Sequence, residues 1–320
     1  MTTGFISNLG IKLFTVGSLQ SQQVVLSKLN QQLASNQKHN NLTDYTPLEA
    51  QNIMNFQNAI TQRQSYVAAM KTVSARLEIY DDTMTDLENL ASQARQLAVQ
   101  NPLQDTNRTG IIQQQILAFI NQGVVDLNQK VGSRYIYSGT RYTTVPVDLN
   151  TVLTTGVPGA LVTSPTLPPY DTDAPGNSTS AWTNDTVTID TGYDLQYGAT
   201  STQTGFQQLI AGMQYIYAAS QTGVSAANYA TYMDQAATLL SSALTNIQTY
   251  HAGVAAAINT VKQQQDTLNG DISSLEQQIG DIKSVDLTKV GTELNLLQTQ
   301  LQASYSAAAT LTQQTILKYL

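Results

Sequence analysis

Hydrophobic residues recur along the last third of the chain at steps of four and three positions in turn. The series begins at Met233 and ends at Ile282, and thirteen of its fifteen members are apolar. Such a heptad repeat is typical of a left-handed coiled coil, because it places one apolar stripe along one side of the helix. Since a long helix cannot bury this stripe alone, the sequence predicts partner helices. The positions are Met233, Ala237, Leu240, Leu244, Ile247, His251, Val254, Ile258, Val261, Gln265, Leu268, Ile272, Leu275, Ile279 and Ile282.

The heptad phase breaks at residues 283–289, and a weaker series follows. Its members are Val290, Leu294, Leu297, Leu301, Ser304, Ala308, Leu311 and Thr315, of which three are small or polar. We therefore expect two successive helices with a joint near Ser284–Thr288.

The N-terminal part of the chain mirrors this order. A first amphipathic stretch carries Leu9, Leu13, Val16, Leu19, Leu26, Leu29 and Leu33, and polar residues then interrupt it up to Pro47. Proline favours the first turn of a helix, so a second helix is expected to begin there. This helix should end at Asn101-Pro102, and a third is expected over roughly 106–131.

The middle of the chain has a different composition. Residues 142–204 are rich in Thr, Gly, Asp and Pro, and they contain six of the eight prolines. Short alternating runs such as 186–190 predict β-strands between turns. Because the long apolar series avoid this segment, we expect its removal, by joining Tyr142 to Thr204, to leave the helical part folded.

These patterns predict a mainly α protein: a long antiparallel coiled-coil helical rod with a β-rich inserted domain. The expected divisions are 1–45, an N-terminal assembly helix that pairs with the C-terminus; 46–141, N-terminal rod helices; 142–204, the insertion; 205–285, C-terminal rod helices; and 286–320, a C-terminal assembly helix. Both termini should lie at the same end.

Charge and composition narrow the function. The net charge of −7 resides in the segment between Arg141 and Lys262, which has seven Asp and no Lys or Arg. A nucleic-acid or anionic-membrane surface needs basic residues, so neither partner is expected. The chain has no cysteine and two histidines, and it lacks the common nucleotide, hydrolase and zinc motifs. We expect no enzyme, no cofactor and no metal site.

A few residues could nevertheless carry chemistry. Asp171 and Asp173 could bind a cation, although a solvated turn is the commoner reading, and Asp81-Asp82 suggests a solvated helix face. His251 and Gln265 occupy core positions of the heptad series, where a polar residue usually packs or sets the register. The aromatic residues of the insertion could stack on a sugar or form a small β core; they are Trp182, Tyr170, Tyr193 and Tyr197.

Three segments resemble the bacterial flagellin family, and within it the FlgL-type hook–filament junction proteins. Residues 90–100 (LASQARQLAVQ) resemble the rod-helix segment containing RELAVQ, with Gln96 in place of Glu. Residues 132–139 (GSRYIYSG) resemble the turn after the rod helix of junction proteins. Residues 301–320 resemble the junction-protein C-terminus that begins LQASY. The first twelve residues match the family poorly.

The resemblance implies a structural subunit of the bacterial flagellum. Such a protein is exported by the flagellar type III apparatus, with an export chaperone, and lies outside the cell. It would join copies of itself in an eleven-subunit ring-like zone between a FlgK-type hook-associated protein and flagellin. Two alternatives remain open: a divergent flagellin filament subunit, or a surface carbohydrate-binding adhesin that uses the insertion.

The terminal helices are the expected assembly interface. The candidate residues are Leu9, Leu13, Val16, Leu26, Leu33, Val290, Leu294, Leu297, Leu301 and Leu311. Because the series in 9–33 and 290–315 are thin, we expect residues 1 to about 40 and about 286–320 to be mobile in the free monomer and to become helical on assembly.

Overall fold

The structure is a computed structural model that describes residues 3–101, 103–105, 108–149, 152 and 183–317. The side chains of residues 3–12 and 311–317 lie outside this description, as do Asp171, Asp173, Tyr170 and Trp182. The chain forms two compact units. Unit 1 comprises Met1–Gln62 and Asp271–Leu320, and unit 2 comprises Arg63–Gly270.

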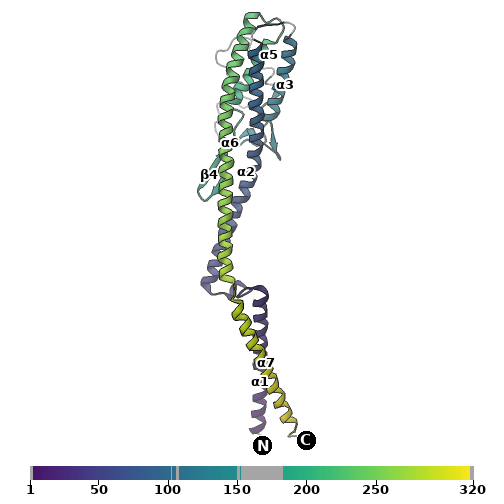
Figure 1. Cartoon of the computed structure of the whole chain (residues 1–320), viewed down its shortest axis with the longest axis vertical. Coiled ribbons are helices and arrows are strands. Elements are labelled where there is room, and N and C mark those ends of the chain that lie inside the picture. The colour runs from purple at the N-terminus through teal and green to yellow at the C-terminus, as the bar shows by residue number, and fades with distance from the viewer. Residues whose placement is uncertain (1–2, 102, 106–107, 150–151, 153–182, 318–320) are drawn as a thin grey trace. The chain divides into compact units, whose positions relative to one another are not determined.

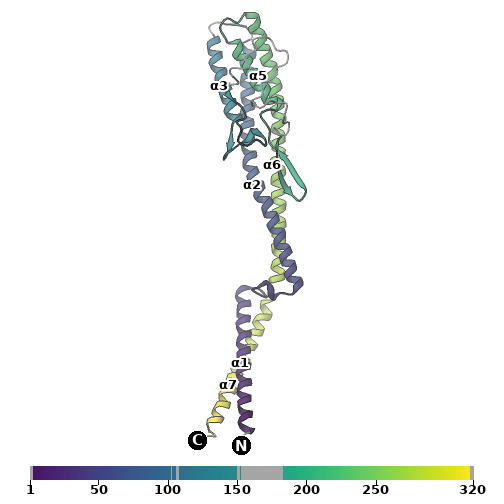
Figure 2. The ribbon, with the colours of Figure 1, turned by 180° about the vertical axis from the view of Figure 1, so that it is seen from behind.

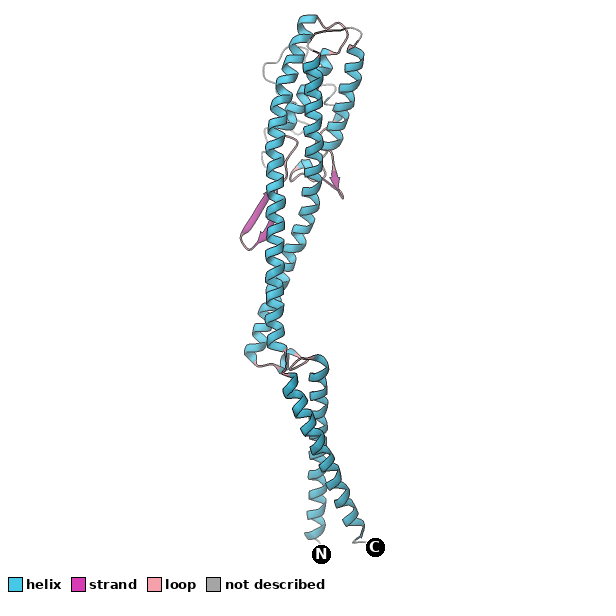
Figure 3. Cartoon of the chain, in the orientation of Figure 1, coloured by secondary structure: helices cyan, strands magenta, loops and turns pink. Residues whose placement is uncertain are grey.

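Helices make up most of the described residues, which confirms the mainly α fold class (Figure 3). They are α1 (Thr3–Ser35), α2 (Pro47–Gln100), α3 (Thr109–Leu127), α5 (Thr204–Ala219), α6 (Ala226–Lys283) and α7 (Leu287–Leu317). Two short antiparallel strand pairs accompany them, β1 (Lys130–Val131) with β2 (Arg134–Tyr135), and β3 (Asp185–Asp190) with β4 (Tyr193–Tyr197). The predicted start of a helix at Pro47, its end before Pro102 and the joint after Lys283 are confirmed.

The start of α2 is fixed by a capping box. The Thr46 hydroxyl accepts a hydrogen bond from the Glu49 N–H at 3.3 Å, and a Glu49 carboxylate oxygen accepts one from the Thr46 N–H at 3.2 Å. This reciprocal pair satisfies backbone donors that have no partner inside the helix. Together with the fixed φ of Pro47, it sets the residue at which the helix begins.

In unit 2, α2 and α6 run antiparallel and in contact. Gln265 bonds to Ser74 at one level, and His251 bonds to Glu88 at another. The heptad series accounts for the buried face of α6, since every second member from Met233 to Leu268 is buried. The intervening members, among them Leu244 and Ile258, are partly buried against the same core. The predicted coiled-coil stripe is therefore confirmed along this part of α6.

The helices α3 and α5 complete the core of unit 2, and both lie beside α2 and α6 in Figures 1 and 2. Two glycines of α5 allow a close approach to α6. A Cβ added at Gly212 would come within 2.6 Å of the Leu240 Cγ, and one at Gly205 within 2.9 Å of the Asn246 Cβ. Because these two positions carry no side chain, α5 and α6 can pack closely there.

The segment GSRYIYSG folds into a hairpin and a single 3-10 turn, η2 (Ile136–Ser138), rather than extending the third helix. Tyr137 is completely buried there, and its hydroxyl lies 2.6 Å from that of Thr83 on α2. Its ring contacts Tyr80 and Phe206 edge-on, with centroids 5.0 and 5.3 Å apart. The turn therefore ties the loop after α3 to both α2 and α5.

The described part of the insertion also belongs to this core, which corrects the expectation that it is dispensable. Asp185 on β3 forms ion pairs with Arg134 and, at 3.8 Å, with Arg76 of α2. The Tyr197 hydroxyl donates to the same carboxylate at 3.0 Å. Five described apolar residues of 142–204 are buried in the common core, namely Val147, Val152, Ile189, Tyr197 and Ala199. The heptad pattern missed them because strands and turns bury single residues without a helical period.

In unit 1, α1 and α7 pack as an antiparallel pair, side by side in both views (Figures 1 and 2). The Gln23 amide donates to the Tyr305 hydroxyl at 2.9 Å. At the other end of the pair, the Lys38 N–H donates to the Lys283 carbonyl at 2.7 Å, and the Val285 N–H donates to the Asn36 carbonyl. The predicted antiparallel pairing of the two terminal helices is therefore confirmed.

Candidate assembly interface

Eight of the ten predicted interface residues have described side chains, and these fall into two groups, of which the first holds α1 to α7. Val290, Leu297 and Leu301 are buried, with exposed fractions of 3%, 8% and 6%, and they form a small core with Leu29 of α1. Leu26 and Leu294 pack against this core and are partly buried. This part of the predicted set joins two helices of the same chain.

The second group remains in contact with solvent. Leu13, Val16 and Leu33 have exposed fractions of 66%, 52% and 45%. Leu9 and Leu311 lie outside the described side chains. About half or more of the surface of each of these three side chains is left uncovered and is available to another chain.

The structure adds exposed apolar residues that the pattern did not identify. On α1 these are Phe14, Val24 and Val25, with exposed fractions of 79%, 70% and 46%. On α7 they are Leu287, Leu296 and Tyr305. They were missed because they lie outside the four-three series. Leu13 and Val24 are eleven residues apart, about three helical turns, and so are Phe14 and Val25. A search for apolar residues at this spacing would have found the exposed residues of α1.

The helix α1 is consequently apolar on two sides. At about 100° per residue, the face containing Leu13 and Val24 lies roughly opposite the face through which Leu26 and Leu29 contact α7. A helix that is apolar on both sides is stable in water only when both are covered. The pair α1–α7 covers one of them.

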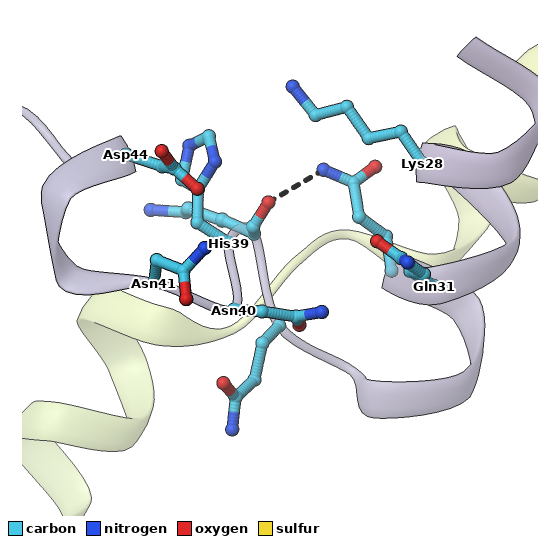
Figure 4. A pocket seen from close by; sticks show the side chains of 9 residues that line it. Lys28, Gln31, His39, Asn40, Asn41 and Asp44 are labelled. Atoms are coloured by element: carbon cyan, nitrogen blue, oxygen red, sulfur yellow. Dashed lines mark hydrogen bonds between the residues drawn. The ribbon is translucent and has the colours of Figure 1, made fainter. Parts of the chain in front are cut away.

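A polar pocket of about 660 Å³ lies beside the connection between α1 and α2 (Figure 4). Its lining residues are Lys28, Gln31, Gln32, Gln37, Lys38, His39, Asn40, Asn41 and Asp44. The Gln32 amide donates to the Lys38 carbonyl at 2.8 Å, which fixes the wall of the pocket. The two lysines are balanced by Asp44 and by Glu49, the ion-pair partner of Lys38. The lining therefore favours neither anions nor cations.

The described residues were compared with what a metal site and a membrane-spanning helix require. In the parts of the chain that the structure describes, no three His, Asp or Glu side chains are grouped so that they could hold a metal ion. None of the described helices has the combination of length and apolar character needed to cross a membrane.

His251 is more than a packed residue in the heptad series, and this corrects the sequence interpretation. Its Nδ1 lies 2.7 Å from a Glu88 carboxylate oxygen, and its Nε2 lies 3.0 Å from an Asp81 carboxylate oxygen. Asp81 is thus bonded across the α2–α6 pair as well as facing water. Burial alone would lower the pKa of His251, but the hydrogen bonds to Glu88 and Asp81 outweigh it and raise that pKa.

Asp126 is a carboxylate of unit 2 whose pKa is also shifted. Burial raises its pKa to about 6, although the Gln122 amide donates a hydrogen bond to one carboxylate oxygen at 2.8 Å. The second oxygen is buried and has no hydrogen-bond partner. A buried carboxylate with one unsatisfied oxygen costs stability when it is charged.

Long antiparallel helices place the chain in the class of mainly helical, coiled-coil proteins. Residues 237–320 match the family of the bacterial flagellin C-terminal helical region. Among solved structures, the chain is similar to a flagellar hook-associated protein of Vibrio parahaemolyticus, with 13% identity and a TM-score of 0.57, over 75% of this chain and 100% of that one. It is also similar to FlgL of Bacillus cereus, with 17% identity and a TM-score of 0.50, over 70% and 96% of the two chains.

No curated protein matches the sequence. At 13% and 17% identity, the two structural similarities establish a shared fold. Together with the match of residues 237–320 to the flagellin C-terminal helical region, they support the resemblance inferred from the sequence, and the chain has the fold of these two flagellar proteins.

Proposed function

We propose that the protein is a structural subunit at the junction between the hook and the filament of the bacterial flagellum, and that α1 and α7 carry its assembly. The observation that supports this most strongly is the second apolar face of α1, on which Leu13 and Val24 are 66% and 70% exposed. Apolar residues at this density on a terminal helix need a partner surface. Copies of the same chain, packed through their terminal helices, supply one.

The partners follow from this role. A FlgK-type hook-associated protein lies on the hook side of the proposed eleven-subunit zone, flagellin lies on the filament side, and an export chaperone accompanies the chain before assembly. The protein reaches the outside of the cell through the flagellar type III apparatus. Its role is mechanical and not catalytic.

The exposed face is tested by a double substitution, Leu13→Ser with Val24→Ser. Burial of each apolar side chain contributes about 1.5–3 kcal/mol, so the double variant should bind isolated hooks on the order of a hundredfold more weakly or worse. Its melting temperature as a monomer should stay within a degree or two of the wild type, because both side chains contact water there.

Leu103→Ser is the matched control, since Leu103 is 78% exposed and belongs to unit 2. It should bind hooks as the wild type does. Equal binding by the double variant and the control would contradict assembly through this face.

The divergent-flagellin and adhesin alternatives are separated by other measurements. A filament flagellin is present in large excess over the hook, whereas a junction subunit is present in proportion to it, so quantitative mass spectrometry of isolated flagella distinguishes them. Retention of the full chain on a glycan array, lost on substitution of the exposed Tyr193 by alanine, would favour the adhesin.

A further inference from the structure

The side chain of His251 spans two levels of α2. Its two ring nitrogens point to opposite sides, one to Glu88 at 2.7 Å and the other to Asp81 at 3.0 Å. Asp81 and Glu88 are seven residues apart, about two helical turns, and so they lie on the same face of α2. One ring on α6 therefore bridges two carboxylates on α2.

This geometry requires a particular protonation state. An ionised carboxylate only accepts hydrogen bonds, and a neutral imidazole carries a single N–H. Both contacts are hydrogen bonds only when the ring carries protons on both nitrogens. When one proton leaves, a nitrogen lone pair faces a carboxylate oxygen, and that contact becomes repulsive.

The other charged groups do not replace this interaction. In the described part of the chain, Asp81 and Glu88 form ion pairs with His251 and with no lysine or arginine. The charges that act on the ring are those of Glu88 and Asp81 on α2. Asp126 on α3 also titrates near neutral pH, because burial raises its pKa to about 6. The charge that acts on Asp126 is that of Asp86 and not that of His251.

We propose that His251, Asp81 and Glu88 form a pH-sensitive clasp, which holds α6 against α2 while the imidazole is doubly protonated and loosens this pair when the imidazole loses a proton. The clasp interrupts an otherwise apolar stripe between Ile247 and Val254, both of which are buried. It is therefore placed where a change in polar contact alters helix pairing directly.

The direction of the effect follows from the protonation states. The folded chain holds the proton on His251 more tightly than the unfolded chain, for which the ordinary pKa is about 6.5. The clasp is thus closed below about pH 6.5 and opens as the pH rises through the higher pKa of the folded state. Mild acid tightens the α2–α6 pair, and alkali loosens it.

The first test is an NMR titration of the wild-type chain, which has only two histidines, His39 and His251. His39→Gln assigns the remaining imidazole signals to His251. Both ring nitrogens should stay protonated above pH 6.5, and Glu88→Gln should move the midpoint to lower pH. A wild-type midpoint at or below 6.5, or a neutral ring throughout, would contradict the clasp.

The second test measures local opening by hydrogen exchange in residues 77–91 and 244–258, corrected for intrinsic exchange. One charge-assisted hydrogen bond corresponds to on the order of a tenfold change, so wild-type opening should rise about tenfold between pH 6 and pH 9. His251→Gln should abolish this difference, while His39→Gln should retain it. Asp126→Asn should retain it too, which separates the clasp from the titration of Asp126. Equal pH responses in wild type and His251→Gln would overturn the proposal, and the wild-type titration decides it if that variant does not fold.

Discussion

The cores of the two compact units differ in how completely they are closed. In unit 2, residues from α2, α3, α5, α6 and the loop strands contribute to one continuous core, with many side chains fully buried. Among its described side chains, the α1–α7 pair of unit 1 has a core of four buried residues, Leu29, Val290, Leu297 and Leu301. Each helix of the first core has neighbours on several sides, whereas α7 covers only one of the two apolar faces of α1.

This difference indicates that unit 2 is stable by itself and that the α1–α7 pair is less so. Helices in water obtain most of their stability from packing, so unit 2 should fold as an independent body. The described part of the α1–α7 pair buries fewer side chains, and under the proposed function other subunits supply the remaining burial on assembly. A terminal segment of low intrinsic stability is also easier to thread through an export conduit.

Truncation of a buried leucine should have the largest effect, and its size should depend on the unit. Leu268 of α6 is 2% exposed within the continuous core, so Leu268→Ala should lower the free energy of unfolding by about 2–5 kcal/mol. Leu301→Ala in the terminal pair should leave the main melting transition unchanged. Chemical denaturation of both variants checks this; equal losses would place the two units in one cooperative core.

Close packing between α5 and α6 gives the next largest effect. An alanine at Gly212 would force its Cβ into Leu240, and this overpacking should destabilise unit 2 by about 1–3 kcal/mol. Gly253 on α6 has open space around its missing side chain, so Gly253→Ala should stabilise the helix by about 0.5–1 kcal/mol. Opposite shifts in melting temperature are expected, and a neutral Gly212→Ala would show that the helices separate easily.

A further effect, which depends on pH, concerns Asp126. Its folded pKa of about 6 exceeds that of an unfolded aspartate, so the folded chain gains stability as the pH falls from about 7 to about 4. Asp126→Asn removes the buried charge and should stabilise unit 2 by about 1–2 kcal/mol at pH 8, with little change at pH 4. Melting curves at the two pH values test the sign; destabilisation at pH 8 would mean that the carboxylate makes a needed contact.

The helical architecture could be predicted because its signals are periodic or local. The heptad series located the buried face of α6, and Pro47 and Asn101 marked the ends of α2. The joint after Lys283 followed from the break in phase. These features depend on neighbouring residues along one helix, which a single sequence displays directly.

The polar contacts and the second apolar face could not be found in this way. The partners of His251 are more than 160 positions away, and no spacing rule connects them. Asp185 likewise meets Arg134 and Arg76 through the folding of the loop strands. Of the ten predicted interface residues, those in the intramolecular core were indistinguishable in pattern from the exposed ones, because both belong to apolar helical stripes.

Limited proteolysis of the purified monomer, compared with the assembled junction, tests the central claim most directly. Early cuts in the monomer should fall before Pro47 and after Ile282 and leave a resistant fragment of about 45–285, which stays monomeric and does not bind hooks. In the assembled state the same sites should be protected. Termini as resistant in the monomer as residues 233–282, or a trimmed fragment that still assembles, would contradict the account.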